Sequence, residues 1–230
     1  MARVAKVDNA FKKRFDRNEK KRTVGTRNKM VYFLIICEGA KTEPNYFSAL
    51  EKELPRGTIE LKIDGTGRNT IGLVKYAIRQ RDESIRKYDR VWAVFDKDDF
   101  PNKSFNGAIK VASNNNINCA WTNEAFELWF LLHFQYVNTG MNRDDYKAYL
   151  EREIINKTGN QSYKYLKNDP KTFSILKIHG NQSQAILWAA QLKLNHTDQR
   201  FYKHNPCTLV HELIYELMHP QEVLDKLKKD

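Results

Sequence analysis

The sequence has few cysteines and no long apolar run, and both absences narrow the class of protein. Its 230 residues include three cysteines, Cys37, Cys119 and Cys207, with no C-x-x-C spacing. A disulfide scaffold and a structural zinc site are therefore not expected, and the thiols should be reduced and mostly buried. The longest apolar runs, near residues 31–37 and 125–134, are too short to cross a bilayer, and the N-terminus is charged where a secretory signal is apolar. We expect a cytoplasmic protein that contacts no membrane.

The composition is that of a folded chain, with 41% hydrophobic and 12% aromatic residues. This is enough to bury a core, so disorder of the whole chain is excluded. The net charge of +11 is distributed unevenly. Residues 1–29 hold 11 Lys or Arg and three acids, a net +8, which leaves +3 for the other 201 residues.

The segment 1–29 is too polar to fold alone, and we interpret it as a mobile basic arm. Two hypotheses remain open for it. It is a solubility tail, or it is an arm that binds phosphates without sequence preference and loses affinity steeply with salt. The residues expected to contact nucleic acid are Lys12, Lys13, Arg14, Lys20, Lys21 and Arg22.

The chain after the arm alternates between β-rich and helical patterns. This alternation predicts βαβ units, hence an α/β fold with an open parallel sheet of about four strands and helices on both faces. Strands are expected near 30–37, 59–63, 90–95 and 117–122, and helices near 42–50, 70–86 and 103–115.

From Asn123 onward the sequence predicts helices and no further strand. The expected organisation is a basic arm at 1–29, an α/β core at 30–137 and a helical C-terminal region at 138–230 packed on that core. The predicted helices cover about 124–135, 142–157, 182–196, 206–218 and 221–229, and the pattern at 158–181 leads to no assignment.

Acidic residues follow two of the predicted strands. Glu38 comes directly after the first strand, and Asp96 and Asp98 come after the third. Ligands of open parallel sheets gather at the carboxyl ends of the strands, and residues two apart in an extended chain point the same way. If these strands are neighbours, the three carboxylates repel one another unless a cation lies between them, and hard oxygen ligands suit Mg²⁺ or Mn²⁺. The alternative is an exposed acidic turn and a surface glutamate.

Glu127 lies in a predicted helix that is apolar almost all round and should therefore be buried. A buried carboxylate without a partner costs several kcal/mol, so something must bind it. That partner is either a neighbouring helix, through a hydrogen bond or salt bridge, or a metal ion shared with the other acids. His133 lies about 120° further round this helix and is interpreted as a core histidine.

Two basic residues are candidates for contacts to a substrate phosphate. Lys41 lies at a predicted helix N-terminus, where backbone N–H groups can meet an anion, and a surface role is the alternative. Arg68 lies in a glycine-containing turn after the second strand, which we interpret as a strand-to-helix turn capped by Asn69 or Thr70. Asn205-Pro206 predicts a helix start.

The E-G loop after the first strand, together with a D-x-D after the third, resembles the Toprim fold of topoisomerases, bacterial primases and OLD-type nucleases. Three stretches resemble the RloB family more specifically. These bacterial proteins are linked to restriction loci and abortive phage infection. The stretches are Ile36-Cys-Glu-Gly-Ala-Lys-Thr-Glu-Pro-Asn-Tyr-Phe47, Asn123-Glu-Ala-Phe-Glu-Leu-Trp-Phe-Leu-Leu-His-Phe134 and Asn205-Pro-Cys-Thr-Leu-Val-His211.

The resemblance implies a role for each acid. Glu38 would act as general base or metal ligand, and Asp96 and Asp98 would be the paired metal-binding aspartates. It also implies a Mg²⁺- or Mn²⁺-dependent nuclease for DNA or RNA in antiphage defence, with an ATPase of the same locus as partner. The chain has no room for the tyrosine-nucleophile or zinc domains of other Toprim enzymes.

Two alternatives remain open from the sequence. The first is a non-catalytic nucleic-acid-binding or regulatory subunit of a defence ATPase complex. The second is an enzyme that uses the same acids for phosphotransfer or for hydrolysis of a small phosphoester on a nucleotide.

Overall fold

The computed structural model describes residues 30–55, 58–97 and 101–228. The expected basic arm, with its six candidate nucleic-acid contacts, lies outside these residues, and so does Asp98.

The core of the molecule is a five-stranded sheet in the order β2-β1-β3-β4-β5. The first four strands are parallel, which confirms the predicted α/β fold with an open, mostly parallel sheet, and β5 pairs antiparallel with β4. The central strands β1 and β3 are buried along almost their whole length, whereas β2 at the edge alternates in exposure. Burial on both faces explains why β1 and β3 have continuous apolar runs. The strands are β1 Val31–Cys37, β2 Ile59–Gly65, β3 Arg90–Asp96, β4 Asn118–Asn123 and β5 Cys207–Thr208.

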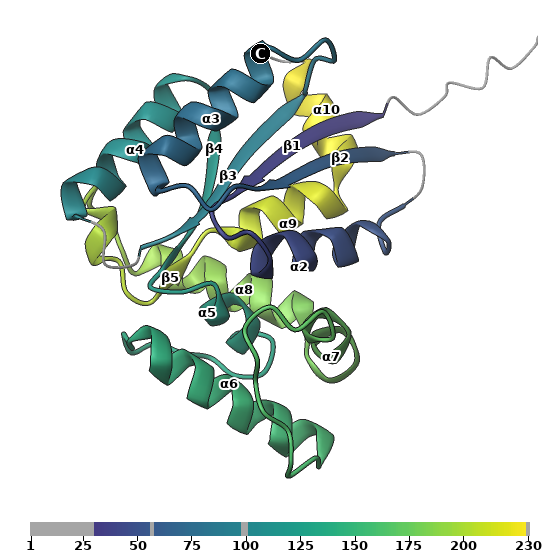
Figure 1. The fold of residues 1–230 in the computed structure, drawn as a ribbon, viewed down its shortest axis with the longest axis vertical. Coiled ribbons are helices and arrows are strands. Elements are labelled where there is room, and N and C mark those ends of the chain that lie inside the picture. The colour runs from purple at the N-terminus through teal and green to yellow at the C-terminus, as the bar shows by residue number, and fades with distance from the viewer. Residues whose placement is uncertain (1–29, 56–57, 98–100, 229–230) are drawn as a thin grey trace, which may run out of the picture.

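Helices cover both faces of the sheet (Figure 1). On one face, α3 (Thr70–Asp82) and α4 (Asn102–Asn114) pack against a cluster that contains Leu34 and Ile36. On the other face, α2, α9 and α10 belong to a larger cluster around Phe33 and Ile35. The remaining bounds are α2 Thr42–Glu51, α5 Glu127–Leu131, α6 Arg143–Thr158, α7 Thr172–His179, α8 Gln182–Leu194, η1 Phe201–Lys203, α9 Val210–Met218 and α10 Pro220–Leu227.

The C-terminal region shares its hydrophobic core with the sheet. Tyr146, Leu150 and Ile154 of α6 are fully buried and belong to the same cluster as the residues of β1 and α2. The helical part therefore packs on the α/β core through one continuous apolar contact.

The structure corrects three of the expectations for local structure and fills one stretch that the sequence left unassigned. A fifth strand exists at Cys207–Thr208, held to β4 by a 2.8 Å hydrogen bond between the hydroxyls of Thr122 and Thr208. Pro206 precedes this strand, so the helix expected from 206 begins only at Val210. The helix expected over 124–135 is restricted to α5, and the unassigned stretch 158–181 contains α7.

The described cysteines are unpaired thiols, and burial raises the pKa of Cys119 and Cys207 to about 12. They are therefore protonated, as expected for structural cysteines. Within the described ranges, no helix is long and apolar enough to cross a membrane.

Candidate active site

The loop after β1 brings Glu38 to the end of β3. The backbone N–H of Glu38 donates to the carbonyl of Val94 at 2.8 Å, which continues the pairing of the two strands by one step. The Glu38 carboxylate in turn accepts a 3.1 Å hydrogen bond from the backbone N–H of Asp96. The two acids predicted to meet at the carboxyl edge of neighbouring strands therefore do so.

Two glycines make this close packing possible. A side chain at Gly39 would overlap the carboxylate of Glu43, and a Cβ at Gly65 would lie 2.8 Å from the carbonyl oxygen of Gly39. The turn after β2 closes on the same loop, because the N–H of Gly67 donates to the Glu38 carbonyl at 2.8 Å. The end of β2 therefore supports the Glu38 loop directly.

Glu43, in the first turn of α2, is a further buried carboxylate of the site. Its side chain is only 6% exposed, and its negative charge acts on Asp96. It was not among the acids expected from the sequence to hold a metal. Next to it, Thr42 donates its hydroxyl to Asn168 at 2.5 Å, and Lys41 occupies the cap position of α2.

Asp96 and Glu127 complete the acidic cluster, which we define as Glu38, Glu43, Asp96 and Glu127. Asp96 is 8% exposed, and its Oδ2 accepts a 3.2 Å hydrogen bond from the N–H of Phe126. Glu127 is fully buried, and its Oε1 accepts a 3.2 Å hydrogen bond from the Tyr165 hydroxyl. The expectation that Glu127 is buried with a partner is confirmed, and that partner comes from the segment between α6 and α7.

Basic and phenolic groups from the C-terminal region face the acidic cluster. Arg143, the first residue of α6, places its Nη2 4.0 Å from Asp96 Oδ2. Burial raises the pKa of Glu43, and the positive charge of Lys167 opposes that rise. Burial and the negative charge of Glu127 raise the pKa of Tyr165, so its hydroxyl remains a proton donor. These contacts were not predicted from the sequence, because they depend on how the C-terminal region packs.

Burial and mutual repulsion favour the protonated forms of two carboxylates in the cluster. The pKa of Asp96 is raised well above its usual value, first by burial and then by the charges of Glu43 and Glu127, while Arg143 opposes the shift. The pKa of Glu43 is also raised, mainly by burial. The site therefore favours either protons or a cation.

Three carboxylate oxygens of the cluster are buried and find no hydrogen-bond partner in the described part of the chain. They are Asp96 Oδ1, Glu43 Oε2 and Glu127 Oε2. A buried polar atom left unsatisfied costs roughly 1–3 kcal/mol. Because all three are hard oxygen donors, they fit Mg²⁺ or Mn²⁺ chemically. Among residues 30–55, 58–97 and 101–228, however, no group of three or more His, Cys, Asp and Glu side chains has an arrangement that could hold a metal ion.

The candidate phosphate contacts lie at the surface near the site. Lys41 is exposed at the start of α2. Arg68 is also exposed and lies 4.6 Å from the ring centroid of Tyr76. The Asn69 side chain caps α3 by accepting the N–H of Gly72, which settles the capping alternative. His133 is a core residue as expected, because its Nδ1 lies 2.9 Å from the Trp129 carbonyl and it is 4% exposed.

A family model described as RloB-like protein matches residues 33–217. The match covers most of the sheet, the acidic cluster and the C-terminal helices as far as α9. The chain therefore belongs to the RloB-like family, as its motifs suggested. No curated protein and no solved structure matches it.

Proposed function

We propose that this RloB-like protein is a divalent-metal-dependent nuclease that hydrolyses phosphodiester bonds of DNA or RNA. The proposal depends on one observation. Three buried carboxylate oxygens, on Glu43, Asp96 and Glu127, lack a hydrogen-bond partner within the described residues. The charges of Glu43 and Glu127 both act on Asp96, which ends β3 at the carboxyl edge of a parallel sheet, the edge where such folds bind ligands.

The residues that would hold Mg²⁺ or Mn²⁺ are those of the acidic cluster, with Asp98 as the further candidate from the sequence. The chemistry that a divalent cation would supply there is polarisation of the phosphoryl oxygen and a lower pKa of the attacking water. Glu38 has the position for a general base, since its carboxylate lies beside the backbone of Asp96. Arg143 supplies a positive charge next to Asp96 that can neutralise a substrate phosphate.

The proposed biological setting is antiphage defence with a partner ATPase, as the family resemblance implies. Lys41 and Arg68 would contact the substrate phosphates at the rim of the site.

Cleavage and metal binding together test the proposal. Glu38→Gln, Glu43→Gln and Asp96→Asn should each abolish Mn²⁺-dependent cleavage of labelled DNA and RNA while the protein stays folded. Calorimetric titration with Mn²⁺ should show weaker binding for Glu43→Gln and Asp96→Asn. Glu51→Gln is the matched control, because Glu51 is an exposed glutamate on the same helix as Glu43. Cleavage at wild-type rate in all three variants would remove the basis of the proposal.

The non-catalytic alternative also has an observation in its favour. Within the described residues, the side chains are not arranged to hold a metal ion. A regulatory or nucleic-acid-binding subunit would keep the fold but show no Mn²⁺ binding. Titration with Mn²⁺ alone therefore separates the two functions, even where an activating partner is missing from the assay.

A further inference from the structure

A groove runs between α4 and η1, on the helix that follows β3. Its volume is about 510 Å³. The described residues that line it include two lysines, two asparagines and one tyrosine, and none of them is acidic. They are Asn102, Lys103, Asn106, Gly107, Lys110 and Tyr202.

One face of α4 forms a side of this groove. Residues 103, 106, 107 and 110 follow the spacing that places side chains on the same side of a helix. Lys103 and Lys110 are both exposed and lie two turns apart, about 10.5 Å along the axis. That span corresponds to roughly three nucleotides at about 3.4 Å per step. Between them, Gly107 has nothing within 4 Å of the position of a Cβ, so the groove is open at its centre.

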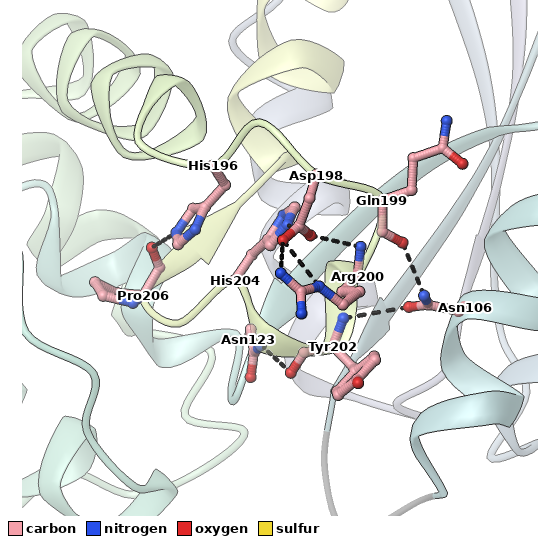
Figure 2. Close-up of polar contacts among 9 residues, drawn as sticks. All are labelled: Asn106, Asn123, His196, Asp198, Gln199, Arg200, Tyr202, His204 and Pro206. Atoms are coloured by element: carbon pink, nitrogen blue, oxygen red, sulfur yellow. Dashed lines mark hydrogen bonds and ion pairs between the residues drawn. The ribbon is translucent and has the colours of Figure 1, made fainter.

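Tyr202 forms the opposite side and is held by its backbone from two directions (Figure 2). The Asn106 side chain accepts from the N–H of Tyr202 at 3.2 Å and donates to the carbonyl of Gln199 at 2.8 Å. On the other side, the Asn123 amide donates to the Tyr202 carbonyl at 3.1 Å. Lys203 adds a positive charge 5.9 Å from the Tyr202 ring centroid.

The turn before Tyr202 is also fixed by polar contacts. Asp198 accepts a 2.7 Å hydrogen bond from the N–H of Arg200, and its carboxylate lies 3.3 Å from Nε2 of His204 (Figure 2). His204 is buried and packs at 6.1 Å from the Trp121 ring of β4. The tyrosine is therefore presented by a preorganised segment, which reduces the entropy lost when a ligand binds.

The groove is linked to the end of β3 through β4, because Asn123, which donates to the Tyr202 carbonyl, directly follows Thr122, the register partner of Asp96. Asp96 and Asn102 are six residues apart, so their Cα atoms are at most about 20 Å apart. Since Asp96 ends β3 and Asn102 begins α4, both lie toward the carboxyl edge of the sheet. A polymer in the groove could therefore extend to the acids.

We propose that the α4–η1 groove binds single-stranded nucleic acid, with Lys103 and Lys110 on its phosphate chain and Tyr202 stacked on a base. The charge of the groove complements a polyanion, and an aromatic ring beside basic residues is the usual arrangement for binding single strands. A paired strand is disfavoured because its bases are already stacked inside the duplex. The inference deepens the proposed nuclease function by naming where the substrate is held, and it rests on that function.

The test measures binding without cleavage. Fluorescence anisotropy in EDTA follows a labelled 20-nucleotide single strand of mixed sequence, with the full chain carrying Lys103→Ala/Lys110→Ala, Tyr202→Leu or Tyr202→Phe. The lysine variant should reduce the slope of log K against log salt concentration by about 1.4, which is two phosphate contacts at about 0.7 each. Tyr202→Leu should weaken binding roughly 5- to 100-fold, and Tyr202→Phe should retain it, because only the stack is needed.

A matched variant, Lys75→Ala/Lys157→Ala, removes two exposed lysines on α3 and α6 and should bind like the wild type. Thermal unfolding checks that each variant is folded. Wild-type binding in both groove variants would overturn the inference, as would an equal loss in the matched control or tighter binding of a duplex or an acidic peptide. Failure of the nuclease proposal gives a different result: no variant cleaves or binds Mn²⁺, yet the groove variants still lose single-strand binding.

Discussion

Burial and three neighbouring carboxylates raise the pKa of Asp96, and Arg143 opposes this shift without cancelling it. For a carboxylate with a raised pKa, the folded state binds more protons than the unfolded state. The free energy of unfolding should therefore decrease as the pH rises above 3.8, the ordinary pKa of an aspartate. In the absence of metal, the ionised form of Asp96 therefore works against folding, and a bound cation would offset that cost.

Asp96→Asn should therefore stabilise the metal-free protein while removing its response to metal. In EDTA at pH 8 we expect the melting temperature to rise by about 2–8 °C, the equivalent of about 1–2 kcal/mol for a chain of this size. Saturating Mn²⁺ should stabilise the wild type by about 2.7 kcal/mol at a hundred times Kd and leave the variant nearly unchanged. Differential scanning fluorimetry with and without Mn²⁺ measures both effects. Glu51→Gln, at an exposed position on α2, should change neither. An Asp96→Asn variant that melts lower and keeps the Mn²⁺ response contradicts the account of Asp96.

His133 gives a pH dependence of the opposite sign. Burial lowers its pKa to about 4 from the ordinary 6.5, so the unfolded state binds more protons between these values. Stability should fall by roughly 3 kcal/mol as pH decreases from 6.5 to 4. Urea unfolding at several pH values, compared between the wild type and His133→Gln, isolates this contribution. Parallel curves for the two proteins would show that His133 does not titrate on unfolding.

Glu38, Asp96 and Glu127 could be predicted because each signal is local. Glu38 directly follows the buried strand β1, Asp96 is the last residue of the buried strand β3, and Glu127 is the first residue of the apolar helix α5. Arg143 and Tyr165 could not be predicted, since they come from segments whose position depends on tertiary packing. Glu43 lies in the same motif as Glu38. Its side chain becomes buried only when α2 packs on the sheet.

The secondary structure shows the same division between local and long-range information. Strands β1 to β4 and the helices α2, α3, α4, α6 and α8 were predicted because their apolar periodicity extends over several residues. Strand β5 has two residues, too few for any periodicity, and exists because it pairs with Thr122 and Asn123 of β4. Strand β5 connects the segment around Tyr202 to the sheet.

The turn at the end of β2 supports the Glu38 loop, and Gly65→Ala should disturb that support. The new Cβ would lie 2.7 Å from Cγ of Pro44 and 2.8 Å from the Gly39 carbonyl oxygen, so the loop must shift. We expect at least a tenfold loss of Mn²⁺ affinity with the sheet intact, measured by calorimetry and circular dichroism.

Gly107→Ala is the control for Gly65→Ala. Gly107 lies in α4 with open space at its Cβ position, so alanine should stabilise the helix by up to about 1 kcal/mol. Mn²⁺ affinity should not change. If Gly65→Ala binds Mn²⁺ as tightly as Gly107→Ala, the Glu38 loop does not require the close contact with β2.

Charge is separated along the whole chain. The first 29 residues carry +8 of the net +11, while the buried acids of the described residues are Glu43, Asp96 and Glu127 of the cluster. A basic arm can raise the local concentration of a polyanion without contributing to the chemistry, because long-range attraction acts on association. The arm and the cluster should therefore be separable by experiment.

Neutralising the arm should weaken polymer binding and leave small-substrate turnover intact. Replacement of Lys12, Lys13, Arg14, Lys20, Lys21 and Arg22 by Gln removes six positive charges, which reduces the salt slope for single strands by up to about 4. The measurements are anisotropy titrations from low to high salt and hydrolysis of bis(p-nitrophenyl) phosphate with Mn²⁺. Replacement of six exposed lysines, Lys52, Lys75, Lys87, Lys157, Lys171 and Lys226, by Gln tests whether total charge alone matters. An unchanged slope in the arm variant would identify residues 1–29 as a solubility tail, whereas a selective loss of polymer binding places the first contact with nucleic acid on the arm.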